Sequence, residues 1–268
     1  MPLYSKILVT SAKGGVGKST TALGLSAAFA RNGKKVLLCD LDIASRSLDM
    51  LTGTEDKSIF NFGDVIKNPA DIQRAEIVPF EEIPQLSIIT APVSEYLSEM
   101  SEEDGCDVKT LIRRGINNLI ENGDFDILIC DSGGGCDIAV AVCDLFDFVA
   151  VTSEQSRTSV RAAEYAAELL KKAGAGVIRV VICGFDLTSV RREYRAGIIE
   201  IVDESTLRCV GVVPFDRKLQ KYQDKGVLPP AKNLSTKAYE NIMRRISGYD
   251  VPLFDGMRKL RRNRKKAF

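Results

Sequence analysis

Residues 13–20 read Lys13-Gly14-Gly15-Val16-Gly17-Lys18-Ser19-Thr20 and lie between a short apolar run at 7–9 and a helix-forming run at 21–29. This order predicts a strand, a glycine-rich loop and a helix. The glycines let the backbone curl so that successive N–H groups point inward at phosphate oxygens, and the first turn of the helix adds partial positive charge. The stretch therefore predicts a site for a nucleoside triphosphate.

The side chains of this loop suit the same ligand. Lys18 would place a full positive charge at the β- and γ-phosphates, and the Ser19 hydroxyl would ligate Mg²⁺. The alternative is a glycine-rich turn with two incidental lysines, which the order of strand, glycines, Lys-Ser and helix disfavours. We expect the whole loop to contact the nucleotide, through Gly14, Gly15, Val16, Gly17, Lys18, Ser19 and Thr20.

The extra lysine at the start of the loop narrows this interpretation. The general phosphate-loop spacing is not met, whereas the shorter frame Lys-Gly-Gly-x-Gly-Lys-Ser/Thr resembles the deviant phosphate loop of the MinD/ParA class of P-loop ATPases. In that class the first lysine reaches across a nucleotide-sandwich dimer to the partner's phosphates. The resemblance implies that Lys13 acts in trans, that ATP with Mg²⁺ is bound and hydrolysed, and that ATP holds a homodimer together.

Composition sets the broad class. The chain has 268 residues, of which 45% are hydrophobic and 27% charged, as expected for one large soluble α/β domain. No apolar run approaches the roughly 20 residues of a membrane span, and the N-terminus lacks a signal-peptide pattern. We therefore expect a cytoplasmic protein.

Cysteine and histidine usage limits the chemistry. The seven cysteines include no Cys-x-x-Cys pair and predict free thiols, mostly in the core. The chain has no histidine, which excludes imidazole ligands and histidine acid–base catalysis. Any catalysis must use carboxylates, lysines, backbone dipoles and Mg²⁺.

Apolar runs alternate with helical patterns along the chain. We expect strands at 35–39, 86–91, 125–131, 148–152, 177–183 and 209–213, and helices at 59–66, 71–77, 107–122, 157–172, 194–202 and 236–247. Near-continuous apolar strands between helices predict a mostly parallel twisted sheet covered on both faces, the three-layer α/β sandwich of a P-loop NTPase. The domain is expected to span 1–250, followed by a tail at 251–268.

Three carboxylates follow predicted strands. Asp40 and Asp42 come just past one strand and Asp131 ends another, at the sheet edge where ligands bind in open parallel folds. We expect Asp131 and Asp40 to support Mg²⁺ and Asp42 to position the lytic water, because an ordinary carboxylate is a weak base. Capping a strand end and solvating a loop are the alternatives.

Two of these segments carry the resemblance further. Residues 40–49 resemble the class pattern Asp-x-Asp-Ile-Gly-Leu-Arg-Asn-Leu-Asp, with departures at 44, 45 and 47. Asp131-Ser132-Gly133-Gly134-Gly135 resembles hydrophobic-Asp-Ser-Pro-Ala-Gly, with Gly133 and Gly134 in place of Pro and Ala. The glycines should loosen this switch segment around the γ-phosphate.

The base-binding end is less well marked. Residues 211–216 resemble Gly-Val-Ile-Pro-Glu-Asp, which implies that Pro214, Phe215 and Asp216 border the adenine. The class usually has an Asn after the preceding strand, where this chain has Asp186. Asp186 could accept from adenine N6 but also suits the guanine edge. The resemblance favours ATP. Residues 153–161 resemble the segment that begins a helix at the dimer face.

The tail is strongly basic. Residues 251–268 carry a local charge of +6, which leaves −5 on the rest of a chain of net charge +1. Leu253, Phe254, Met257 and Leu260 fall at helical spacing among basic residues, and the resemblance implies an amphipathic helix that binds an anionic membrane through 253–266 when ATP drives dimerisation. A disordered solvated tail and nucleic-acid binding remain open.

Three functions follow from these patterns. The first is a regulatory ATPase, peripherally membrane-associated when ATP-bound, that positions cell division or another surface apparatus and answers to an activating protein partner. The second is a ParA-like partition ATPase that binds DNA. The third is an iron–sulfur carrier of the same superfamily, for which Cys136 is the one cysteine near the switch segment.

Overall fold

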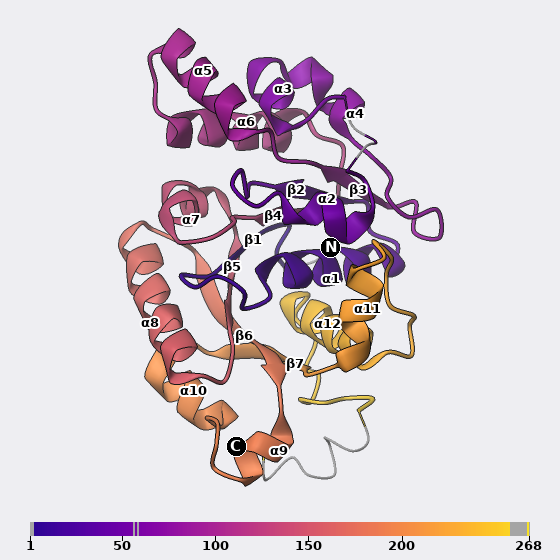
Figure 1. Ribbon diagram of the computed structural model, residues 1–268, viewed down its shortest axis with the longest axis vertical. Coiled ribbons are helices and arrows are strands. Elements are labelled where there is room, and N and C mark those ends of the chain that lie inside the picture. Colours follow the sequence, from indigo (N-terminus) through magenta and orange to yellow (C-terminus); the bar gives the residue numbers. More distant parts are fainter. Residues whose placement is uncertain (1–2, 56, 58, 258–266, 268) are drawn as a thin grey trace.

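Seven parallel strands form the centre of the protein in the order β3-β2-β4-β1-β5-β6-β7 (Figure 1). This computed structural model describes residues 3–55, 57, 59–257 and 267. All neighbouring pairs among the described strands are parallel, which confirms the predicted sheet. The strands are β1 (Lys6–Thr10), β2 (Val36–Asp40), β3 (Leu86–Ile89), β4 (Ile127–Asp131), β5 (Phe148–Ser153), β6 (Val177–Phe185) and β7 (Cys209–Pro214).

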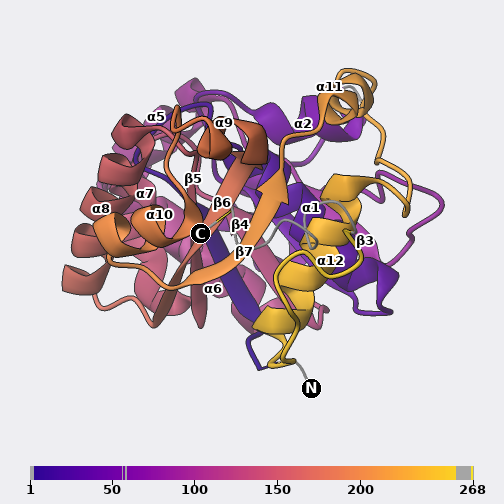
Figure 2. The ribbon, with the colours of Figure 1, turned by 90° about the horizontal axis from the view of Figure 1, so that it is seen from below.

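Helices cover both faces of the sheet. On one face α1 (Lys18–Arg31) packs beside α12 (Leu234–Ile246), and on the other lie α6 (Val108–Asn122), α7 (Asp137–Val142), α8 (Arg157–Lys172) and α10 (Ile198–Ser205) (Figure 2). The strands are apolar along their whole length because both faces are buried, and Ile7, Leu8 and Val9 of β1 are completely enclosed. The predicted three-layer α/β sandwich is confirmed.

Strand order decides where a ligand can bind. The chain leaves β1 through α1 toward β2 on one side of the sheet, whereas it leaves β4 through α7 toward β5 on the other side of β1. In open parallel sheets ligands bind at such a switch point. Asp40 and Asp131 lie opposite each other in the β2–β4 pair, and Val9 lies opposite Asp131 in the β1–β4 pair. The fold therefore brings the glycine-rich loop and both strand-end carboxylates to one edge.

Most predicted helices are present with small shifts. The helix predicted at 157–172 is α8, and that at 107–122 is α6, whose Asp107 accepts from the Thr110 N–H as its N-cap. The helix predicted at 194–202 begins only at Ile198, with Gly197 as its N-cap. Short helices flank the sheet, namely α2 (Ser47–Thr52), α3 (Phe62–Lys67), α4 (Ile72–Ala75), α5 (Ser94–Asp104), α9 (Leu187–Arg191) and α11 (Arg217–Gln223).

The start of the tail belongs to the folded domain. Phe254 and Met257 are 2% and 3% exposed, and the Phe254 ring centroid lies 6.1 Å from that of Phe185 at the end of β6. The Arg245 Nε donates to the Val251 carbonyl at 2.8 Å. Residues 251–257 contain turns and no helix. The predicted amphipathic helix is therefore wrong for this part, because its apolar residues complete the core.

The remainder of that prediction, Leu260 and the basic residues of 258–266, lies outside the described residues. Beyond them, the Ala267 carbonyl accepts from the Ile198 N–H at 2.9 Å. Within the part of the chain that the structure describes, no helix combines the length and apolar character needed to cross a membrane.

Candidate functional site

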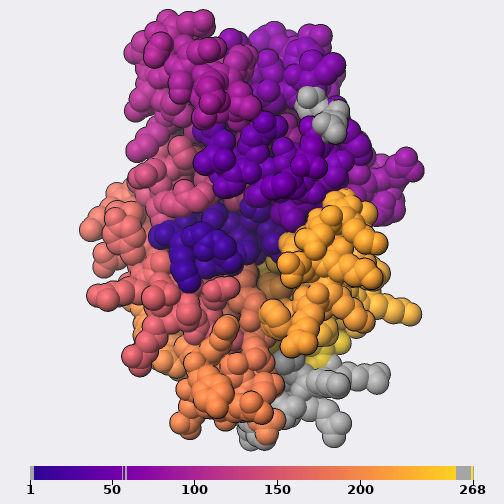
Figure 3. Space-filling model, in the orientation of Figure 1, coloured from indigo at the N-terminus to yellow at the C-terminus, as the bar shows by residue number. Residues whose placement is uncertain are grey.

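The glycine-rich loop borders a cavity of about 680 Å³ at the carboxyl edge of the sheet. In Figure 3 the indigo N-terminal part of the chain reaches the surface beside the orange segment that contains α11. Cavities of this size commonly hold a small molecule or cofactor. The lining comes from the loop and three other segments: Gly14, Gly15, Gly17, Lys18, Ser19, Thr20, Asp42, Ser45, Ser47, Met50, Leu51, Glu55, Gly134, Gln220, Gln223 and Asp224.

The loop conformation depends on its glycines. Gly15 and Gly17 have φ angles of 74° and 85°, which residues with a Cβ rarely adopt. Gly17 is the N-cap of α1, whose first turn contains no acidic residue and includes the largely buried Lys18. An anion in the cavity would therefore meet a lysine and the positive end of a 14-residue helix. Val16 is buried and does not line the cavity.

Asp131 has the geometry of a cation ligand. It is completely buried; its Oδ1 accepts from the Gly133 N–H at 3.4 Å, and its Oδ2 has no hydrogen-bond partner. Burial raises the pKa of Asp131 to about 6, although the nearby Ser19 hydroxyl and the charge of Lys18 lower it. A bound cation would offset the cost of an unpaired carboxylate oxygen. Ser19 and Asp131 could therefore hold Mg²⁺.

Asp40 is used differently. Its Oδ1 accepts from the Asp42 N–H at 2.8 Å and its Oδ2 from the Leu48 N–H at 3.3 Å. Burial, followed by the charge of Asp131, raises the pKa of Asp40 well above its ordinary value. Because both oxygens hold backbone groups, Asp40 fixes the turn after β2, and this geometry favours Asp131 over Asp40 as the cation ligand.

Asp42 reaches the cavity from that turn. It is 6% exposed, and its Oδ1 accepts from the Ser45 N–H at 3.0 Å. The Ser19 hydroxyl lies 2.8 Å from that of Ser47, so the segment after Asp42 also contacts the first turn of α1. Asp42 thus occupies a place from which a carboxylate could orient a water, and its role stays a prediction.

Lys13 points away from the cavity that contains Lys18. Its Nζ donates to Ser159 Oγ at 3.0 Å and lies 3.9 Å from a carboxylate oxygen of Glu154. The cavity-lining residues do not include Lys13. Its backbone is fixed by Ser11, whose hydroxyl accepts from the Lys13 N–H and donates to the Lys13 carbonyl. The two lysines of the loop therefore face different surroundings, although both were predicted to contact phosphates.

The predicted base-binding residues lie apart from the cavity. Asp186 is the N-cap of α9, where it accepts from the Thr188 N–H and the Ser189 hydroxyl, and the Ser189 bond is the main reason that its pKa is lowered. Asp216 caps α11 in the same way, Pro214 ends β7 and Phe215 is mostly exposed. None of these four residues lines the cavity.

Helix α11 contributes lining residues that the sequence did not predict. Gln220, Gln223 and Asp224 line the cavity, and the Gln223 amide donates to the Thr20 hydroxyl at 2.6 Å. The one available signal was the position of residues 217–223 directly after a strand end. Polar residues in a short exposed helix give no stronger pattern.

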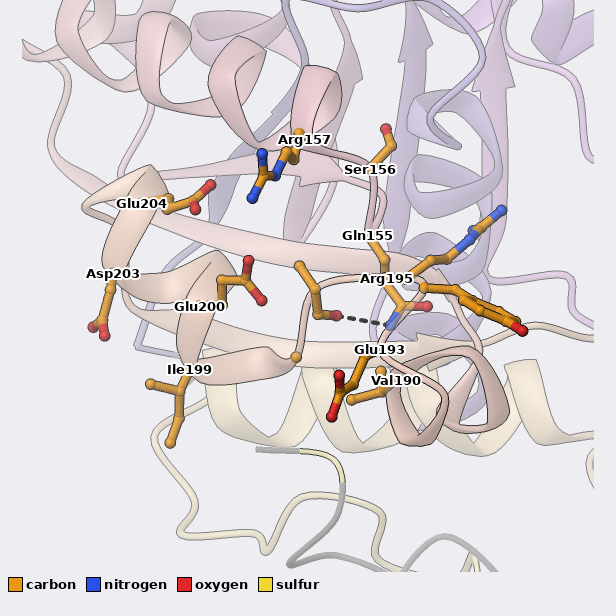
Figure 4. A pocket seen from close by; sticks show the side chains of 13 residues that line it. Gln155, Ser156, Arg157, Val190, Glu193, Arg195, Ile199, Glu200, Asp203 and Glu204 are labelled. Carbon is orange, nitrogen blue, oxygen red and sulfur yellow. Dashed lines mark hydrogen bonds between the residues drawn. The ribbon is translucent and has the colours of Figure 1, made fainter.

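A second cavity, of about 930 Å³, lies between α8 and α10 (Figure 4). Its wall includes Gln155, which is buried, donates to the Ala196 carbonyl at 3.0 Å and accepts from the Asp186 N–H at 2.6 Å. This amide ties the start of α8 to the segments before α9 and α10. The described residues around this cavity include none of the predicted site residues.

The cysteines give little support for a cluster. Burial raises the pKa of Cys136 to about 11, so its thiol stays protonated near neutral pH. The described residues contain no group of three or more histidine, cysteine or acidic side chains that could hold a metal ion. All seven cysteines are described, and all are free thiols.

Comparisons with known proteins agree with this geometry. Residues 3–247 match the family model described as ParA: NUBPL iron-transfer P-loop NTPase. The septum site-determining protein MinD of Synechocystis sp. is 30% identical over 254 residues, covering 94% of this chain and 92% of that protein. MinD of Bacillus subtilis is 29% identical over 250 residues, covering 92% and 90%.

Solved structures show the same fold. The MinC:MinD cell division protein complex of Aquifex aeolicus contains a chain that is 25% identical, with a TM-score of 0.78 and coverage of 93% of this chain and 98% of that one. The MinD of Pyrococcus horikoshii, complexed with Mg-ADP, has a TM-score of 0.74 at 20% identity, with coverage of 90% and 95%. The chain therefore belongs to the ParA family of P-loop NTPases, and it is a MinD-like ATPase.

Proposed function

We propose that this protein is an ATP-driven dimerisation switch. Two subunits would enclose two ATP molecules, with the Lys13 of each reaching the phosphates bound by the other, and hydrolysis would separate them. The observation that carries this proposal is the placement of Lys13 against Ser159 and Glu154, outside the cavity that contains Lys18. A lysine that is turned away from its own phosphate site could reach a neighbouring one.

The residues in and beside the cavity would divide the chemistry between them. The loop N–H groups and Lys18 would bind the β- and γ-phosphates. Ser19 and the unpartnered oxygen of Asp131 would hold Mg²⁺, which neutralises charge on the phosphate oxygens. Asp42, which also lines the cavity, would orient the attacking water. The candidates for binding the nucleotide base remain Pro214, Phe215, Asp216 and Asp186. Helix α11 is closer to the cavity than these residues, because Gln220 and Gln223 line it.

The dimer would in turn control attachment to an anionic surface, most simply a membrane. Residues 258–266 include seven Lys or Arg, and each basic side chain near an anionic bilayer contributes about 1 kcal/mol. Two tails in a dimer bind far more tightly than one. Because Phe254 and Met257 belong to the core, this attachment would rest on charge rather than on their insertion. The protein would be cytoplasmic when bound to ADP.

The names of the relatives suggest a biological setting. The similar proteins include septum site-determining proteins, and one solved neighbour is a complex of MinD with MinC. Positioning of cell division or another surface apparatus, together with a protein that activates hydrolysis, is therefore the setting we propose. An iron–sulfur carrier is the second candidate, because the family model carries an iron-transfer description. Absence of iron–sulfur absorbance after anaerobic reconstitution would end that second candidate.

Dimerisation can be tested by light scattering during size exclusion. The wild type should form a dimer with a non-hydrolysable ATP analogue and Mg²⁺ but stay monomeric with ADP. Lys13→Ala should stay monomeric with both nucleotides. Lys172→Ala is a matched control that should dimerise as the wild type does, because Lys172 ends α8, far along the helix from Ser159, which contacts Lys13. A Lys13→Ala protein that dimerises as the wild type does would refute the proposal.

Surface attachment needs a separate experiment. Flotation with phosphatidylglycerol vesicles should depend on ATP and on residues 258–268, and should survive an excess of duplex DNA. A chain that ends at Met257 keeps Phe254 and Met257 but loses the buried Ala267, so thermal melting must show that it folds before flotation is compared. Loss of flotation to the DNA would move the protein toward the partition class.

A further inference from the structure

The segment after β4 rests directly on the turn that carries Asp42. Gly133 has a φ angle of 72°, in the left-handed region. A Cβ at this position would lie 2.8 Å from Asp42 Cγ and 2.9 Å from both Asp42 Cα and Cβ. Real Cβ atoms do not approach other atoms so closely, and one of these neighbours is backbone. Residue 133 must therefore be glycine for two independent reasons, its conformation and its contact with Asp42.

The neighbouring glycines are placed differently. Gly134 lines the phosphate cavity, has open space where a Cβ would be and does not have a left-handed φ. Gly135 has a φ of 82° but also faces open space, and it forms an isolated bridge with Ser11 just before the glycine-rich loop. Only Gly133 among these three glycines both needs a left-handed backbone and touches Asp42.

Asp42 is held from two sides as a result. Its N–H donates to Asp40 Oδ1 at 2.8 Å, which fixes its backbone from the β2 side. Gly133 contacts its Cα, Cβ and Cγ from the β4 side, and the Gly133 N–H itself donates to Asp131. Contact at the Cα matters most, because an added methyl group could not be accommodated by rotating the Asp42 side chain.

We propose that Gly133 is a positioning residue for ATP hydrolysis, which fixes the Asp42 carboxylate in the cavity by direct backbone packing. The inference rests on the proposed role of Asp42 in orienting the attacking water. It also explains a departure from the class pattern, which has proline here. Proline keeps φ near −65° and has no N–H, so it could adopt neither this backbone nor the bond to Asp131.

Gly133 and the nearby Gly135 provide the experiment and its control. Gly133→Ala should lower kcat about 100-fold, because a misplaced catalytic group costs that much when it moves by about 1 Å. Its ATP affinity, measured with a fluorescent analogue, should stay near that of the wild type because the loop is untouched. Gly135→Ala is the control, because it carries the same left-handed backbone strain without contact to Asp42, and it should lose much less activity than Gly133→Ala.

A double-variant comparison shows whether the effect passes through Asp42. Single-turnover rates would be measured for Gly133→Ala, Asp42→Ala and the two combined, with thermal melting to confirm folding. If Gly133 acts by positioning Asp42, the combined variant should be no slower than Asp42→Ala alone. Losses that multiply in full would overturn the inference, as would Gly133→Ala turning over as fast as Gly135→Ala.

The same data separate this inference from the function it rests on. If Asp42→Ala is inactive and Gly133→Ala is not, only the inference fails. If Asp42→Ala hydrolyses ATP at the wild-type rate, the water-positioning role of Asp42 is wrong and the inference falls with it.

Discussion

The two ends of the sheet's carboxyl edge are built in different ways. At β1, β2 and β4 the glycine-rich loop and Asp42 line the phosphate cavity, and Asp40 and Asp131 lie at the neighbouring strand ends. At β6 and β7 the residues that resemble the class pattern cap their own helices, while Phe185 packs against Phe254 from the end of the chain. The proposed phosphate site is encoded in a short stretch of sequence, whereas the structure at β6 and β7 depends on tertiary packing.

The largest expected effect is a loss of stability, and it tests the packing of Phe254 at the β6–β7 end of the sheet. Phe254→Ala should lower the free energy of unfolding by about 3–5 kcal/mol, because it removes a buried aromatic side chain. Urea denaturation of Tyr249→Ala, which changes an exposed residue nearby, gives the control. A loss below about 1 kcal/mol for Phe254→Ala would mean that residues 251–257 do not belong to the core.

The next effect is a pH dependence of Mg²⁺ binding beside the phosphate cavity. The pKa of Asp131 is raised to about 6, so below that pH the folded protein holds a proton where Mg²⁺ would bind. The Mg²⁺-dependent tightening of ATP binding should weaken up to about tenfold per pH unit below this value, because the cation must displace the proton. Asp131→Asn should remove this pH dependence together with most of the Mg²⁺ effect.

The same shift has a consequence for stability without nucleotide. A carboxyl group with a raised pKa binds its proton more tightly in the folded state, so its contribution favours folding more as pH falls from about 6 toward about 4. The contribution of Asp131 is isolated by comparing the unfolding free energies of the wild type and Asp131→Asn between about pH 4 and about pH 6. A constant difference between the two proteins would contradict the raised pKa.

The smallest effect concerns the base end. Asp186→Ala should cost about 1 kcal/mol of stability as the loss of an N-cap, while Asp186→Asn should retain the cap. Both variants should bind ATP and discriminate against GTP as the wild type does. A large change in base preference in either variant would show that Asp186 leaves its cap to read the base, and would remove the contrast between the two ends.

The sequence predicted the architecture and the phosphate end because both are written in short patterns. Alternating apolar runs located all seven strands, and the loop from Lys13 to Thr20 located the cavity. The contributions of Gln220 and Gln223, the capping by Asp186 and the burial of Phe254 could not be predicted in this way. Each of these features depends on which segment packs beside it in three dimensions. The apolar residues at 253–257 have the spacing of a helix, but the segment forms turns.

The central claim is that Lys13, which lies outside the cavity of its own subunit, acts on the nucleotide of the partner subunit. One mixing experiment can test this claim. Lys13→Ala and Asp42→Ala should each be inactive in ATP hydrolysis. In a mixed dimer, the Lys13→Ala subunit keeps its Asp42 and would receive Lys13 from the other subunit. An equimolar mixture should therefore recover activity, at most roughly a quarter of the wild-type rate if subunits pair at random. A mixture as inactive as its components would show that Lys13 does not act across a dimer.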